Sequence, residues 1–110
     1  MKQGPTETAD DTQIPDFRVV FTTQPLSQTV AAPTGFTVSV VATTAPAGGT
    51  LSYQWSNSPD GVTFTPVGGA TSASLVVANS TGLNNYRYRC AVAVTSGATV
   101  NSGVATITVT

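Results

Sequence analysis

Apolar and polar residues alternate with a period of two along much of the chain, which is the pattern of half-buried β-strands. The clearest example is the run Phe36-Thr37-Val38-Ser39-Val40, in which the apolar side chains all fall on one face. Glycine, proline, asparagine and aspartate separate such runs at short intervals, and no run has a helical period. The pattern therefore predicts an all-β protein.

A sandwich of seven to eight strands is the architecture that we expect from these runs, because two antiparallel sheets packed face to face bury the apolar faces. Between two of the strands, the Asp60-Gly61 pair predicts a tight turn, with Asp60 capping the turn rather than binding calcium. The expected strands span residues 17–22, 28–31, 36–40, 51–55, 62–67, 74–77, 86–94 and 105–110.

Charge divides the chain into two parts. Residues 1–16 contain one lysine and four carboxylates, a net charge of −3, whereas residues 17–110 contain three arginines and one aspartate, a net charge of +2. A segment as polar as residues 1–16 cannot bury enough surface to fold by itself. We expect it to form an extended acidic arm held by a neighbouring chain, with a fold-back onto its own body as the alternative, and residues 17–110 to form one β-sandwich domain.

The composition argues against several classes of function. The sequence has no histidine, so neither a histidine-activated nucleophile nor a zinc site is expected, and residues 17–110 hold one carboxylate where paired-carboxylate hydrolysis needs two. Three arginines make no basic face for nucleic acid, and no run approaches the roughly 18 apolar residues of a membrane span. We expect no enzyme, no cofactor, no metal, no nucleic-acid partner and no membrane insertion.

Cys90 is the only cysteine, so the chain cannot form an internal disulfide. The first residues also lack the apolar stretch of a secretory signal. Together these features favour synthesis in a reducing cytoplasm. We expect Cys90 itself to be buried and inert, because no histidine is present to activate its thiol.

Two short motifs resemble those of immunoglobulin-like (Ig-like) sandwiches. Tyr53-Gln54-Trp55 lies on one expected strand and Tyr88-Arg89-Cys90 on a later one. Over roughly residues 22–110, the order of motifs is similar to that of the Ig-like domains of bacterial surface and bacteriophage structural proteins. The further matching runs are Thr23-Gln24-Pro25, Gln28-Thr29-Val30, Gly35-Phe36-Thr37-Val38, Gly69-Ala70-Thr71-Ser72 followed by Leu75-Val76-Val77, and Asn85-Tyr86-Arg87.

The resemblance implies that these motifs build a core. In that fold a buried tryptophan packs against a disulfide between the second and sixth strands, and a tyrosine two residues before the second cysteine bonds nearby backbone through its hydroxyl. Here the second strand lacks a cysteine, so Val40 or Val38 would face Cys90 as an apolar contact. The predicted core residues are Trp55, Tyr88, Cys90, Val40 and Leu75.

The resemblance also implies a structural role in a virus particle, with the protein made in the host cytoplasm and located in the virion. One Ig-like domain would decorate a capsid or tail structural protein of the same particle, docked by its arm through strand addition or groove contacts. Ile14, Phe17 and Val19 would be the apolar anchors of this contact, with Arg18 between the last two.

Three other interpretations stay open on the sequence alone. Arg87 and Arg89 share the outward face of one strand and would meet a partner's carboxylate or the acidic arm of another copy, with a solvated surface as the simpler alternative. The domain would otherwise be a carbohydrate- or cell-surface-binding module with a weak host-surface glycan as ligand, although its loops 45–50, 57–62 and 96–103 carry no aromatic residue. The last alternative is a spacer domain of a larger adhesin.

Overall fold

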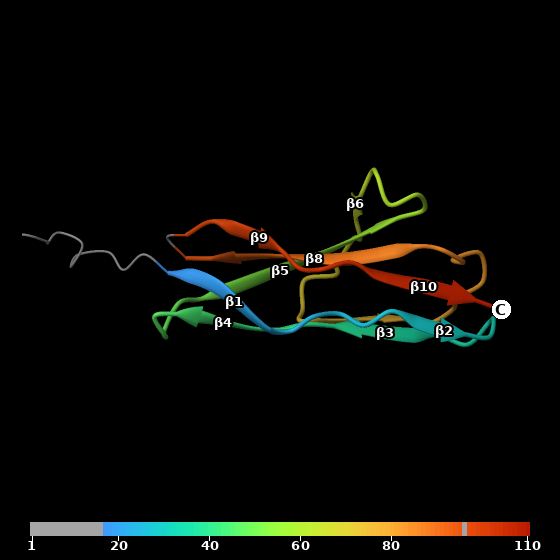
Figure 1. The fold of residues 1–110 in the computed structure, drawn as a ribbon, viewed down its shortest axis with the longest axis horizontal. Helices are drawn as coiled ribbons and strands as arrows, with labels where there is room; N and C mark the ends of the chain where they lie inside the picture. Colours follow the sequence, from blue (N-terminus) through green and yellow to red (C-terminus); the bar gives the residue numbers. More distant parts are fainter. Residues whose placement is uncertain (1–16, 96) are drawn as a thin grey trace, which may run out of the picture.

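The computed structural model describes residues 17–95 and 97–110, so Ile14 and the rest of the expected arm lie outside the described residues. The described residues form ten β-strands and no helix, as the alternating pattern predicted (Figure 1). The strands are β1 (Arg18–Thr23), β2 (Gln28–Val30), β3 (Phe36–Ser39), β4 (Val41–Ala45), β5 (Leu51–Ser58), β6 (Thr65–Pro66), β7 (Ser74–Val77), β8 (Arg87–Val94), β9 (Thr99–Asn101) and β10 (Ala105–Val109).

One layer of the sandwich is built around β3 and β4, which follow each other with only Val40 between them. β4 pairs antiparallel with β1, and β3 pairs antiparallel with β7. β1 and β7 therefore pair with successive parts of the same stretch of chain.

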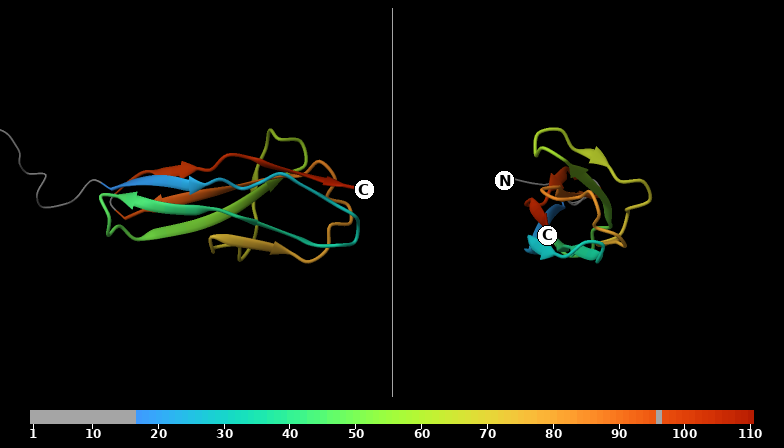
Figure 2. Two further views of the ribbon diagram at one scale, coloured as in Figure 1. Left: turned by 60° about the horizontal axis from the view of Figure 1, so that its bottom comes forward. Right: turned by 90° about the vertical axis from the view of Figure 1, so that its right-hand side faces the viewer.

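The other layer has the strand order β2-β10-β8-β5-β6, with β9 also beside β8. β2 runs parallel to β10, and the remaining pairs are antiparallel. The pairing of β5 with β8 extends without interruption from Leu51 opposite Val94 to Ser58 opposite Arg87. Seen along the long axis in the right-hand view of Figure 2, the strands of the two layers surround a central core.

The number of strands exceeds the expected seven to eight for local reasons. The strand expected at residues 36–40 continues past Val40 as β4, and the loop expected at residues 96–103 contains β9. The strand expected at residues 62–67 is reduced to β6, because the N–H groups of Val62 and Thr63 donate to the Asp60 carboxylate in the preceding turn.

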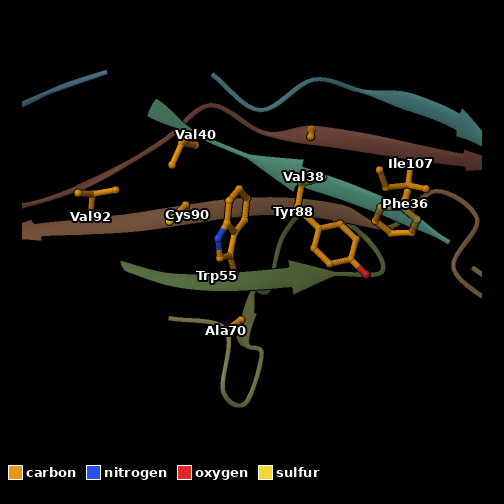
Figure 3. Packing of buried hydrophobic residues seen from close by; sticks show 10 residues of the cluster. Phe36, Val38, Val40, Trp55, Ala70, Tyr88, Cys90, Val92 and Ile107 are labelled. Carbon is orange, nitrogen blue, oxygen red and sulfur yellow. The ribbon is translucent and has the colours of Figure 1, made fainter. Parts of the chain in front are cut away.

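Trp55 and Cys90 form the centre of the core. They lie opposite each other in register on β5 and β8, and neither exposes any surface to solvent. Val38 and Val40 reach this pair from the other layer, and Val40 points toward Cys90 and the Trp55 ring (Figure 3). The structure thus confirms that valine takes the place of the second half-cystine, and burial raises the pKa of the Cys90 thiol.

The segment that leads from β6 to β7 closes over the open edge of Trp55. The indole Nε1–H donates to the backbone carbonyl of Ser72 at 2.8 Å. The backbone N–H of Trp55 donates to the carbonyl of Ala70 at 3.0 Å, and its carbonyl accepts from the N–H of Val67 at 2.8 Å. All polar groups of this buried residue are therefore satisfied, and burial of so large a ring stabilises the fold by roughly 2–3 kcal/mol.

Tyr88 is buried as predicted and packs edge to face on Phe36, with ring centroids 5.5 Å apart at 72°. Burial raises the pKa of the Tyr88 phenol, and an interaction with the Asn57 side chain opposes that shift. Among the described residues, the hydroxyl donates no hydrogen bond to backbone. The expected backbone contact of the hydroxyl is therefore wrong, although the core role of the ring is confirmed.

Leu75 lies at the margin of the core and not inside it. It is opposite Val38 on the β3–β7 ladder and packs against the buried cluster, but it is only partly buried. The prediction that Leu75 is a core residue holds for its contacts and fails for its burial, because no strand of the described residues lies on the other side of β7.

Gly35 precedes β3 at a place where two backbones come into close contact. A Cβ at this position would overlap the carbonyl oxygen of Val77 and lie 2.8 Å from that of Ala78. By contrast, a Cβ at Gly68 would meet nothing within 4 Å.

We therefore expect Gly35→Ala to destabilise the domain by about 1–3 kcal/mol, because the backbone must shift to admit the methyl group. Gly68→Ala is the matched control and should change the free energy of unfolding by less than about 1 kcal/mol. Urea denaturation of both variants measures this difference, and equal stabilities would show that β3 and β7 do not approach as closely as described.

Candidate interaction surface

Arg87 and Arg89 lie on the outer face of β8. Tyr88 and Cys90 point into the core, so the residues that alternate with them point away from it. The chain between β5 and β6 folds back onto this face, where it brings Phe64 to Arg89. We call Arg87, Arg89, Phe64 and the turn Ser58–Thr63 the arginine surface.

Two side chains close the turn of the arginine surface. The Ser58 hydroxyl donates to Asp60 Oδ1 at 2.8 Å and accepts from the backbone N–H of Gly61 at 2.8 Å. Asp60 Oδ1 also accepts from the backbone N–H groups of Val62 at 2.8 Å and Thr63 at 3.2 Å. Gly61 has a φ of 79°, which an L side chain rarely adopts. Asp60 caps the turn, as the Asp-Gly pair predicted.

These hydrogen bonds favour the ionised form of Asp60. The N–H of Val62 contributes most, followed by the Ser58 hydroxyl, and together with the N–H of Thr63 they lower the pKa of Asp60 from 3.8 to about 2. Because Asp60 is exposed, its negative charge remains available at the molecular surface.

Both arginines are occupied by their own domain. The Arg89 guanidinium lies over the Phe64 ring, 4.1 Å from the ring centroid, which is a cation–π contact. Arg87 lies against Gly61, and its Nη1 donates to the backbone carbonyl of Asn85 at 3.3 Å. Both side chains are partly buried. Among the described residues neither arginine is paired with a carboxylate, and a contact with a partner's carboxylate stays a prediction.

Phe17 and Val19 also contact their own domain. Val19 is partly buried and packs against the core from β1. Phe17 is partly buried as well, and a Cβ added at Gly49 would lie 3.0 Å from its ring. Both residues are therefore held by their own domain, and their role as anchors of a partner stays a prediction. Arg18 between them is exposed, and Ile14 lies outside the described residues.

Several exposed aliphatic side chains were not singled out by the sequence pattern. Val62 at the tip of the turn is 82% exposed, and Val76 on β7 is 71% exposed. The sequence did contain a signal for Val76. Ser74 and Val76 alternate with Leu75 and Val77, which places Val76 on the polar face of the strand. The other exposed aliphatic residues are Leu26, Val41, Val100 and Val104.

The part of the chain that the structure describes has no pocket, and no three of its histidine, cysteine, aspartate or glutamate side chains gather into a possible metal site. Within residues 17–95 and 97–110, no helix is long and apolar enough to cross a bilayer. The surface available for recognition is therefore made of strands, strand edges and turns.

Acidification should open the Asp60 turn. The pKa of Asp60 in the folded protein lies below its ordinary value, so the stabilisation from the carboxylate is present above about pH 4 and is lost as the pH falls toward about 2. An NMR titration should give a carboxyl pKa of about 2, with the Val62 amide shifting at the same midpoint.

Ser58→Ala removes one of these hydrogen bonds and should raise the pKa of Asp60 toward 3.8. A midpoint near 3.8 in the unsubstituted protein would contradict the hydrogen-bonded turn.

Solved structures of immunoglobulin domains are similar to this chain. Tandem Ig repeats of Dlar align with a TM-score of 0.65 and 17% identity, covering 98% of this chain and 55% of that one. A chimeric titin Z1Z2 aligns at 0.55 and 16% identity over 84% of this chain and 94% of that one. Titin M10 in complex with obscurin-like 1 aligns with a TM-score of 0.54 and 16% identity, covering 84% of this chain and 92% of that one.

This chain thus spans about half the length of the Dlar structure. The likeness confirms the Ig-like sandwich and shows the fold alone. The bacteriophage or bacterial type stays a prediction.

No curated protein matches the chain. The family model described as "Domain of unknown function (DUF8696)" matches residues 17–110. Since that match covers most of the sequence, this chain belongs to the family of DUF8696 domains.

Proposed function

We propose that this chain is a non-enzymatic structural protein of a virus particle, in which one Ig-like domain decorates a capsid or tail lattice and residues 1–16 attach it. The observation that carries the proposal is the division of charge, −3 in residues 1–16 against +2 in residues 17–110. An acidic segment on a nearly uncharged domain suits attachment to a basic groove of another protein, because complementary charge selects the partner and speeds the encounter.

The surface of the domain supports a role in display and contact. No charged residue occurs between Asp60 and Arg87, so β6, β7 and their connections present serine, threonine, valine, glycine and asparagine. Exposed valines such as Val76 add apolar contact area to this surface.

The attachment falls to residues 1–16 because Phe17 and Val19 are used inside the domain. Ile14 and the four carboxylates are then the candidate contacts. A contact of this size is weak, and linkage of two or more copies raises its overall strength. Salt should weaken its electrostatic part, since the Debye length is only about 8 Å at physiological ionic strength.

Deletion of residues 1–16 should abolish co-sedimentation with particles of the virus that carries this sequence, while thermal unfolding shows that residues 17–110 remain folded. The matched control keeps the length and Ile14 and replaces the four carboxylates of the segment by amides. It should bind less tightly than the unsubstituted chain, and the difference should shrink as salt is added.

Undiminished binding by the deletion variant would remove the role of residues 1–16. Absence of this chain from purified particles, measured by mass spectrometry, would contradict the virion assignment altogether. Specific binding of residues 17–110 to glycans on an array would favour a carbohydrate-binding module instead of a virion structural protein.

A further inference from the structure

Within residues 17–95 and 97–110, one edge of the sandwich has no strand where the Ig arrangement provides a place for one. In constant-type Ig domains a fourth strand pairs with the fifth and borders the sheet. Among the described residues β7 pairs with β3 alone, and residues 67–72 run along β5 and through turns instead of beside β7. The left-hand view of Figure 2 shows β7 (gold) at the margin of the sandwich with no strand beyond it.

The register identifies the backbone groups on this open edge. The N–H of Val40 donates to the carbonyl of Ala73 at 2.9 Å, and Val38 lies opposite Leu75 on the same ladder. In an antiparallel pair alternate residues direct their N–H and C=O groups to the partner strand. The groups of Ser74 and Val76 therefore point away from β3, and no other described residue bonds to them.

β7 also lacks three of the features with which proteins protect exposed strand edges, namely proline, charge and irregular register. β6 contains Pro66, β1 shifts register between Phe21 and Thr23, and β9 has three residues. The β7 sequence Ser-Leu-Val-Val is uncharged and regular, and Val76 is 71% exposed on it. Among these strands, β7 is the one best suited to accept another strand.

We propose that β7 pairs with β7 of a second copy of this chain, antiparallel and across a two-fold axis. With Val76 opposite the Val76 of the second copy, Ser74 falls opposite Ala78, and these alternate pairs bring together the residues whose backbone groups face the open edge. This register therefore satisfies both edges at once and joins the two β3–β7 ladders into one continuous sheet.

The chemistry of the edge favours a second copy as the occupant. No charged residue occurs from Gly61 to Tyr86, so β7 offers no charge by which a different protein could be selected, and two copies meet without repulsion. Valine and leucine are strong strand formers and suit cross-strand aliphatic pairs. This inference stands apart from the proposed function, although a dimer would carry two copies of residues 1–16 to any partner.

Sedimentation-velocity ultracentrifugation of the full chain should show a monomer–dimer equilibrium in the micromolar range, because the paired strands are short. Val76→Lys places two like charges opposite each other and should raise the Kd of the dimer at least tenfold, which shifts the protein to monomer. Val62→Lys adds the same charge at an 82% exposed position away from β7 and should dimerise like the unsubstituted chain. Circular dichroism checks that both variants stay folded.

A cross-link tests the register itself. Residues opposite each other at a hydrogen-bonded position have Cα atoms about 5.5 Å apart, which a disulfide spans. Val76→Cys should therefore form a covalent dimer under mild oxidation, and Val62→Cys should not; Cys90 is buried and does not interfere.

A monomeric full chain at all concentrations would overturn the proposal. It would also fail if Val76→Lys dimerised like Val62→Lys, or if Val76→Cys cross-linked no faster than Val62→Cys. Dimerisation seen only after deletion of residues 1–16 would overturn it in favour of a self-capped edge. If particle binding depends on residues 1–16 but not on Val76, the proposed attachment and the β7 dimer are tested independently, and failure of one does not count against the other.

Discussion

The contact between Trp55 and Cys90 is the constraint on which the rest of the structure depends. Both side chains are fully buried at matching positions of β5 and β8, and Val40 meets them from the other layer. These three residues join β5, β8 and the junction between β3 and β4, and therefore both layers of the sandwich, without a covalent bond. The thiol acts as a small apolar group, in keeping with the raised pKa that its burial causes.

Trp55 also determines the open side of the molecule. Its buried indole N–H requires an acceptor, which Ser72 supplies, and its backbone bonds Ala70 and Val67. Because residues 67–72 are held along the edge of β5, they do not pair with β7. The same contacts that satisfy the core therefore leave β7 with an open edge and Leu75 only partly buried.

Local patterns were sufficient for the fold class and for the Asp60 turn. Strand alternation has a period of two, and the hydrogen bonds of Asp60 connect residues at most three positions apart. The surfaces needed long-range information. Arg89 meets Phe64 only because the chain between β5 and β6 folds back, and the open edge of β7 depends on where residues 67–72 lie. The sequence alone also could not show that Phe17 is packed by the loop at Gly49.

An engineered disulfide tests the central claim, that Val40 and Cys90 occupy the paired positions at the centre of the sandwich. Under oxidising conditions Val40→Cys should lose both free thiols and gain about 2–4 kcal/mol in the free energy of unfolding relative to its reduced form. Val38→Cys, two residues earlier in the chain and beside Tyr88 rather than Cys90 in Figure 3, should keep its thiols. Two free thiols in the oxidised, folded Val40→Cys variant would contradict the account.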